Sequence, residues 1–233
     1  MLFFPGTDRI VTKQRIVACA GMWLALLPAP ARSGVIRGVL HVPPPVRVTN
    51  LSTGYGDAAG TMPGMHEVVH GLASDAVVYV EHVPDGFDST LAAHGPNPTL
   101  AQRNQAFEPR VLAVAVGTAV DFPNLDPIYH NVFSLSPAKR FDLGKYPRGH
   151  FKTVVFDKVG LVNVYCDIHS NMEAFVRVLP HHAFARPAAD GSFALPDLPP
   201  GRYQLHVWHP DLPETQQSVE VPASGDVRVE VTL

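Results

Sequence analysis

Apolar residues occur along the chain in short runs that alternate with polar ones, a period typical of β-strands. Gly, Pro, Asn and Asp separate the runs, and these residues favour turns. No long segment has the spacing of an amphipathic helix, so the sequence predicts an all-β fold. The predicted strands lie at residues 35–42, 77–80, 99–107, 111–116, 119–122, 132–135, 151–156, 160–165, 174–179, 192–195, 203–208 and 226–233.

The order of these runs predicts two β units. After Pro180 the pattern changes, and the tail 181–233 has only about three predicted strands, which is few for an independent domain. Strands from the early region could complete it. We therefore expect a central barrel at residues 97–180, inserted into a second, smaller β-sandwich that is split between residues 34–96 and 181–233. A single enlarged barrel with decorations is the alternative.

The first 31 residues have the pattern of a secretory signal peptide. Arg9, Lys13 and Arg15 precede an uncharged apolar run, and the small residues Ala29 and Ala31 then offer a cleavage site near Ala31. The run, residues 16–27, is shorter than the roughly 20 residues that span a bilayer, which argues against a membrane anchor. A lipid-attachment site at Cys19 is rejected because the apolar run follows this residue. The sequence thus predicts a periplasmic or secreted protein whose mature chain does not span the membrane.

Charge and cysteine content narrow the function. The formal net charge of −3 lacks the basic excess typical of nucleic-acid binders. The chain has 2 cysteines, and Cys19 would leave with the signal peptide. Cys166 would then have no partner for an internal disulfide in an oxidising compartment. A lone thiol of this kind is a buried apolar group, a nucleophile or a metal ligand.

Four residues favour the metal ligand: His130, and then Cys166, His169 and Met172 at close spacing. Thiolate and thioether sulfur suit Cu(I), and imidazole suits Cu(II) as well; two His and one Cys with a distant axial Met are the ligand set of electron-transfer copper sites. The strand predicted at 160–165 would deliver Cys166 at its end, and one short loop would then supply His169 and Met172. His130 would come from a distant part of the sheet.

Residues 97–180 resemble a cupredoxin, in particular amicyanin and plastocyanin. The family pattern G-x-x-V-x-F-x-N-x-D followed by H-N is present at residues 117–126 and at His130 and Asn131, and the pattern C-x-x-H-x-x-M is present at residues 166–172. The resemblance implies a Greek-key cupredoxin barrel with one type 1 copper. By the same resemblance His130, Cys166 and His169 would be strong ligands and Met172 a weak axial one. Asn131 would join the two ligand loops by hydrogen bonds.

The resemblance also implies a function. Cupredoxins pass single electrons between periplasmic redox partners, such as a dehydrogenase or a cytochrome, usually through the exposed edge of the loop His, here His169. The wider arrangement resembles periplasmic proteins of the methylamine-utilisation type, and the tail resembles carboxypeptidase regulatory-like modules. The chain departs from the family at Asp167 and Ile168, where Thr or Ser and then Pro are common.

Other readings of the sequence stay open. A copper-binding, copper-delivery or adhesive β-module without electron transfer is the main alternative. A copper oxidoreductase would need a second copper cluster, and no paired His-x-His motif offers one, so an enzyme is not expected. The segment His66–His70 matches the zinc-protease pattern H-E-x-x-H, but flanking Gly and internal Val argue against the helix that this chemistry needs. Met62, Met65, His66 and His70 together are a weaker candidate for a copper-loading patch.

Overall fold

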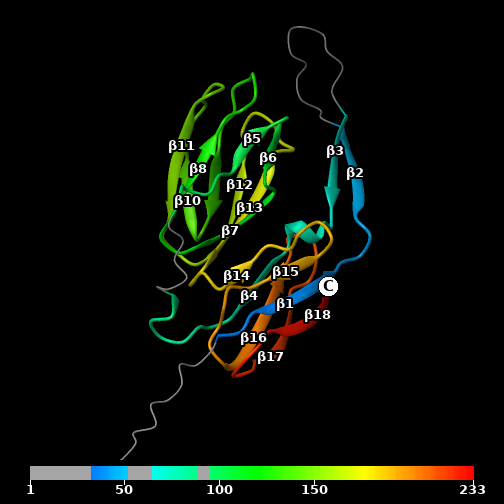
Figure 1. The fold of residues 1–233 in the computed structure, drawn as a ribbon. Helices are drawn as coiled ribbons and strands as arrows, with labels where there is room; N and C mark the ends of the chain where they lie inside the picture. The colour runs from blue at the N-terminus through cyan, green and yellow to red at the C-terminus, as the bar shows by residue number, and fades with distance from the viewer. Residues whose placement is uncertain (1–32, 52–64, 89–94) are drawn as a thin grey trace, which may run out of the picture. The chain divides into compact units, whose positions relative to one another are not determined.

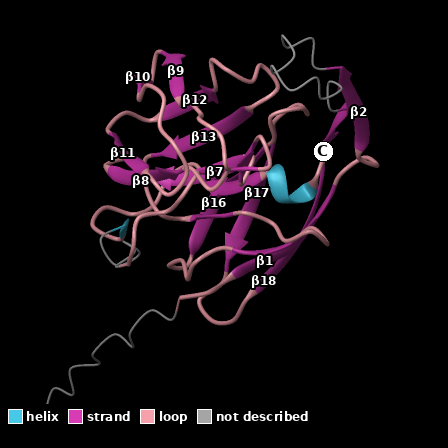
Figure 2. Cartoon of the chain, turned by 90° about the horizontal axis from the view of Figure 1, so that it is seen from above, coloured by secondary structure: helices cyan, strands magenta, loops and turns pink. Residues whose placement is uncertain are grey.

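The computed structural model describes residues 33–51, 65–88 and 95–233. Strands dominate this part of the chain, and Ala73–Asp75 (η1) is a single 3₁₀ turn (Figure 2). The prediction of an all-β fold is confirmed. The predicted signal peptide at residues 1–31 and the residue Met62 lie outside the described residues. The strands are β1 (Ile36–His41), β2 (Val46–Leu51), β3 (Met65–His70), β4 (Val77–Val80), β5 (Ala101–Arg103), β6 (Ala106–Glu108), β7 (Val111–Ala115), β8 (Thr118–Pro123), β9 (Phe133–Ser136), β10 (Lys139–Asp142), β11 (Phe151–Phe156), β12 (Gly160–Tyr165), β13 (Glu173–Leu179), β14 (Phe184–Ala185), β15 (Ser192–Ala194), β16 (Gly201–Trp208), β17 (Thr215–Val221) and β18 (Val227–Thr232).

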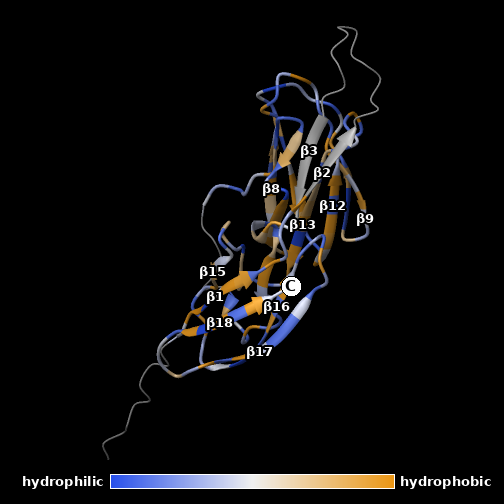
Figure 3. Cartoon of the chain, turned by 90° about the vertical axis from the view of Figure 1, so that its right-hand side faces the viewer, coloured by the Kyte–Doolittle hydropathy of each residue, from blue (hydrophilic) through white to orange (hydrophobic). Residues whose placement is uncertain are grey.

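The central part of the chain forms a five-stranded sheet with the order β10-β9-β12-β13-β7 and a separate pair, β8 with β11 (Figure 1, green and yellow). Alternation drives this arrangement, because β8 buries Val120 and Phe122 while β12 buries Val162 and Val164. Apolar colouring is prominent along β12 in Figure 3. One core cluster contains these residues together with Cys166 and Met172. Strand β13 runs parallel to β7, so the chain crosses between strands here and does not form only hairpins.

Residues 99–107, predicted as one strand, are divided between β5 and β6. These two short strands pair antiparallel as a hairpin. Asn104 and Gln105 form its turn with φ of 53° and 55°, in the left-handed region that suits a tight hairpin turn. The prediction of a continuous strand was wrong because two non-glycine residues adopt this conformation, which their side chains alone do not indicate.

Strands from the two ends of the described chain share sheets. β1 lies between β15 and β18, and β4 lies between β14 and β16, which pairs in turn with β17. A second core cluster fills this part with Ile36, Leu40, Val78, Leu205 and Val219 among its members. A third cluster, which includes Phe175 and Trp208, joins residues of β13 and β16. The predicted split of the second sandwich, with its boundaries, stays a prediction.

The segment that matches the zinc-protease pattern is a strand. β3, Met65–His70, pairs antiparallel along its whole length with β2. A strand rises about 3.3 Å per residue, so positions 66 and 70 lie roughly 13 Å apart along it and not one turn apart as on a helix. The structure therefore agrees with the rejection of a metalloprotease.

Candidate metal centre

Three of the four predicted ligands come from the end of β12 and the short loop that follows it. β12 ends at Tyr165, and Cys166 is the next residue. The Met172 N–H donates to the His169 carbonyl at 3.0 Å, and the Cys166 N–H donates to the Met172 carbonyl at 3.4 Å. These two backbone hydrogen bonds close the loop, so that the residues at its two ends lie side by side at the edge of the sheet.

His130 reaches the same place from a different part of the chain. Its backbone pairs with that of Tyr146: the Tyr146 N–H donates to the His130 carbonyl at 3.0 Å, and the His130 N–H donates back at 3.4 Å. The imidazole is fully buried. The segment before β9 is therefore fixed to the segment before β11 by these two backbone hydrogen bonds.

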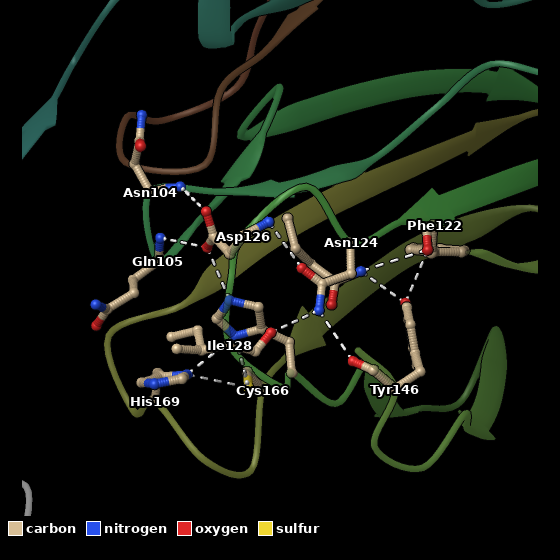
Figure 4. Close-up of polar contacts among 11 residues, drawn as sticks. Asn104, Gln105, Phe122, Asn124, Asp126, Ile128, Tyr146, Cys166 and His169 are labelled. Carbon is tan, nitrogen blue, oxygen red and sulfur yellow. Dashed lines mark hydrogen bonds and ion pairs between the residues drawn. The ribbon is translucent and has the colours of Figure 1, made fainter. Parts of the chain in front are cut away.

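The structure brings His130, Cys166 and His169 together. Figure 4 labels Cys166 and His169, which lie close to each other. The two imidazole Nδ1 atoms are 3.0 Å apart, and Cys166 Sγ lies 3.9 Å from that of His130 and 3.8 Å from that of His169. A point equidistant from these three atoms lies about 2.1 Å from each, close to the roughly 2.0–2.3 Å at which imidazole and thiolate bind a first-row ion such as Zn²⁺. The donor set therefore fits a metal ion of this size.

Met172 and Asn131 are both buried beside this group. Met172 is 1 % exposed and belongs to the same core cluster as Cys166. The Asn131 backbone N–H donates to the Cys166 sulfur, while its side-chain Oδ1 is buried and meets no hydrogen-bond donor in the described part of the chain. Asn131 thus joins the two ligand segments through its main chain. The axial role of the Met172 sulfur and the role of the Asn131 side chain stay predictions.

Asp126 also contacts the candidate site, and the sequence analysis gave it no role. Its carboxylate lies 2.8 Å from His130 Nε2 and accepts hydrogen bonds from the backbone N–H groups of Asn104 (2.6 Å) and Gln105 (2.8 Å), in the β5–β6 turn (Figure 4). Because a carboxylate accepts at Nε2, the proton of the neutral ring resides there and the Nδ1 lone pair faces Cys166 and His169. The Asp-x-x-x-His spacing of Asp126 and His130 is the sequence signal that could have indicated it.

A network of buried hydrogen bonds fixes the backbone around Asp126. The Asn124 side chain donates to the carbonyls of Ile128 (2.8 Å) and Tyr146 (2.9 Å) and accepts the Asp126 N–H (2.9 Å). The Tyr146 hydroxyl donates to the Phe122 carbonyl (2.8 Å) and accepts from Gln102 Nε2 (2.6 Å). Buried polar groups of this kind hold one geometry because each broken hydrogen bond leaves an unsatisfied partner.

The surroundings favour the charged forms that a metal site needs. Burial raises the pKa of the Cys166 thiol, but hydrogen bonds from the backbone N–H groups of Asn131, His169 and Ile168, together with the contact to His130, outweigh it, so the net pKa lies below its ordinary value. Burial likewise raises the pKa of Asp126, yet its hydrogen bonds from Gln105, His130 and Asn104 leave that pKa below the usual range. A thiolate is the form of Cys that binds metals.

The edge of the site is partly open to solvent. His169 is half-buried, whereas His130 is fully buried and Cys166 is 5 % exposed. Four apolar side chains in the two ligand segments are exposed, namely Leu125, Ile128, Tyr129 and Ile168. Among the four candidate ligands, His169 is therefore the one with the most solvent access, and exposed apolar side chains lie in the same two segments.

Comparisons with known proteins give partial likenesses. The family model of the β-sandwich domain of ER membrane protein complex subunit 7 matches residues 167–232, less than a third of the chain. This match begins one residue after Cys166 and includes His169 and Met172 as well as the tail. The matching family is a β-sandwich family and not a cupredoxin family. It also differs from the carboxypeptidase regulatory-like module that the sequence analysis expected for the tail. A search of curated proteins returns no match.

The solved structures that resemble this chain include copper proteins. A copper-containing nitrite reductase from Thermus scotoductus SA-01 is 26 % identical over 38 % of this chain and 23 % of its own, with a TM-score of 0.35. A purple cupredoxin from Nitrosopumilus maritimus is 23 % identical over 36 % of this chain and all (100 %) of its own, with a TM-score of 0.33. An amicyanin mutant in the Cu(I) form is 19 % identical over 44 % and 98 %, with a TM-score of 0.34.

These likenesses are partial in both directions. The chain spans less than a quarter of the nitrite reductase, and the cupredoxins span less than half of this chain. The TM-scores are low, so the metal assignment depends on the ligand geometry and not on these likenesses. Among the described residues, no helix is long and apolar enough to cross a membrane.

Proposed function

We propose that this protein is a type 1 copper protein that passes single electrons between periplasmic redox partners. The observation that carries the proposal is the convergence of His130 Nδ1, His169 Nδ1 and Cys166 Sγ within 3.9 Å of one another in a buried site. The thiolate and the Met172 thioether favour copper over harder ions. When bound, copper would supply one-electron cycling between Cu(I) and Cu(II).

The chain's own residues keep the site in one arrangement. Asp126 fixes the proton of His130 on Nε2, so that Nδ1 keeps its lone pair without any rearrangement. The backbone N–H groups of Asn131, Ile168 and His169 stabilise the Cys166 thiolate. Since these groups are held before any ion binds, little needs to move when the charge at the site changes by one.

The exposed rim suits brief encounters. His169 is the candidate ligand with solvent access, and the two ligand segments carry four exposed apolar side chains, those of Leu125, Ile128, Tyr129 and Ile168. Small interfaces are typical of transient redox complexes. A dehydrogenase or a cytochrome in the periplasm is the class of partner that we propose.

A copper-delivery or adhesive module is the second candidate. The match of residues 167–232 to a domain of a membrane-complex subunit favours a role in protein assembly for this part of the chain. Against copper delivery, His130 is fully buried, Cys166 is 5 % and Met172 1 % exposed. A carrier that hands over its ion needs ligands that an acceptor can reach. The absence of enzymatic activity stays a prediction.

One pair of measurements tests the proposal. The copper-loaded mature protein should show an intense visible thiolate-to-copper band, and voltammetry should give a reversible one-electron wave. Incubation with a Cu(I) chelator of moderate affinity should leave copper in the protein over the time of the voltammetry. Rapid loss of copper to the chelator without a reversible wave would instead support delivery, and the proposal of electron transfer would be wrong.

A further inference from the structure

Charged residues are distributed unevenly along the chain. Residues 97–180 contain nine Lys and Arg against seven Asp and Glu, a balance of +2. Residues 34–96 and 181–233 together contain five Lys and Arg against thirteen Asp and Glu, a balance of −8. The stretch that carries the candidate ligands is therefore basic relative to the rest, and such an asymmetry orients charged partners as they approach.

Part of this positive charge lies beside the candidate ligands. Lys145 is exposed and precedes Tyr146, the residue whose backbone pairs with His130. Its Nζ lies 3.9 Å from the carboxylate of Asp167, the residue after Cys166. Lys152 is also exposed, and its Nζ lies 5.5 Å from the centre of the Tyr146 ring. The segment that carries both lysines thus follows the edge of the site.

Two arginines continue this edge around Asp126. Arg103 and Arg148 line one shallow cavity of about 510 Å³ together with Asp126. The Asp126 carboxylate is hydrogen-bonded to the backbone N–H groups of the β5–β6 turn and to His130 Nε2, so its negative charge is already compensated within the site. Arg148 is exposed, and no carboxylate among the described residues lies within ion-pair distance of it.

Two nearby carboxylates neutralise only part of the positive charge of these Lys and Arg side chains. Glu108 pairs with Arg103 at 3.1 Å, but both side chains are about half exposed. Asp167 lies 3.9 Å from Lys145 in an equally exposed position. Exposed pairs of this kind contribute little and are screened by water, so they leave part of the charge available to a partner.

We propose that Arg103, Lys145, Arg148 and Lys152, here called the basic rim, dock a redox protein with an acidic surface against the candidate metal site. This inference rests on the proposed function and adds to it the charge of the partner. The basic rim attracts carboxylates of the partner, while the acidic flanking stretches repel them. The partner is thereby guided to the end of the molecule at which His169 is accessible.

The test compares electron exchange with two small proteins of opposite charge, an acidic and a basic cytochrome c. For the copper-loaded protein we expect faster exchange with the acidic cytochrome, and a rate that falls as salt rises from about 20 mM to 0.5 M, because the Debye length shortens. Arg148→Glu should slow exchange with the acidic cytochrome by about three- to tenfold at low salt and speed exchange with the basic one.

Lys158→Glu is the matched control. It makes the same change in net charge, but Lys158 follows the opposite end of β11 from the basic rim and is exposed. We expect it to change either rate less than twofold. Equal effects of the two substitutions, or a rate with the acidic cytochrome that does not depend on salt, would overturn the proposal.

Two further measurements separate the possible failures. Hexacyanoferrate(III) serves as a small anionic oxidant: if Arg148→Glu slows this reagent but not the acidic cytochrome, the rim attracts small anions only and the proposal is wrong. An NMR titration of isotope-labelled, metal-free protein with the acidic cytochrome should shift residues of the basic rim without any electron transfer. Shifts there without a copper band would overturn the proposed function and leave the docking surface standing.

Discussion

The segment 124–131 and the loop 166–172 bring their ligands to one point by different means. The segment is held by the backbone pairing of His130 with Tyr146 and also by side chains: Asn124 and Asp126 bind main-chain groups at two other places in the chain, the β5–β6 turn and Tyr146. The loop is closed by two backbone hydrogen bonds, between Cys166 and Met172 and between Met172 and His169. Its exposed residues include Asp167 and Ile168.

The two segments therefore have different roles in the candidate site. The segment 124–131 gives one fixed imidazole that no partner reaches, because His130 is fully buried. The loop 166–172 gives the thiolate, the thioether and an imidazole with solvent access. Changes in the segment should therefore act on metal affinity and stability, and changes in the loop on spectrum, potential and exchange.

The largest effect is expected for Cys166→Ser. The substitution removes the thiolate but keeps the shape of the side chain, so the fold should persist in circular dichroism while the intense visible band is lost. Binding of copper should weaken by more than about a hundredfold, since a hydroxyl is a poor ligand for Cu(I). A variant that still shows the band after copper loading would refute the ligand assignment.

A smaller loss is expected when the anchor of His130 is removed. Asp126→Ala leaves His130 Nε2 and two backbone N–H groups without their acceptor, so metal affinity should fall about 10- to 100-fold. Unfolding of the metal-free protein in urea should show a loss of about 1–3 kcal/mol.

Asp126→Asn is the control for this change, because its amide oxygen still accepts one of these hydrogen bonds. Its affinity, measured by competition with a chelator, should lie between those of the parent and Asp126→Ala. If Asp126→Ala bound copper as tightly as the parent, the segment would not differ from the loop in the way argued above.

The contrast also explains what the sequence could predict. The ligand loop could be predicted because Cys166, His169 and Met172 are close in sequence and each carries a potential ligand atom. Spacing alone therefore suggested Cys166 and His169 as partners. Strands β11 and β12 were predicted at their observed bounds because they lie between clear turn residues and bury alternate apolar side chains. Local periodicity was sufficient in these places.

What the sequence could not reveal depends on contacts between distant residues. The Asp-x-x-x-His spacing could have indicated Asp126 but not the hairpin turn some twenty positions earlier whose backbone N–H groups hold its carboxylate, because no local pattern marks that turn. Strand β17, Thr215–Val221, was missed because its residues are mostly polar and it is recruited by pairing with β16. Strand β10 was missed for a similar reason: it carries charges and follows β9 as a hairpin.

Met172→Gln tests whether the loop sets the reduction potential, and it should cause little loss of copper binding. An amide oxygen is harder than a thioether and favours Cu(II), so the reduction potential should fall while affinity for Cu(II) changes less than about tenfold. Voltammetry of the copper-loaded variant beside the parent measures the shift. An unchanged potential would mean that the Met172 sulfur, although buried, is a core side chain and not an axial ligand.

The smallest effect on the metal site is expected for Tyr146→Phe. The lost hydroxyl donates to the Phe122 carbonyl and accepts from Gln102, both buried, so the free energy of unfolding should fall by about 1–3 kcal/mol. The backbone pairing of Tyr146 with His130 does not use the hydroxyl, so the copper spectrum should not change. Tyr165→Phe, which removes only a 3.4 Å contact with Asn163, is the control and should cost less than about 0.5 kcal/mol. A changed copper spectrum in Tyr146→Phe would show that the Tyr146 hydroxyl affects the ligand geometry. The proposed division of roles between the segment 124–131 and the loop 166–172 would then be wrong.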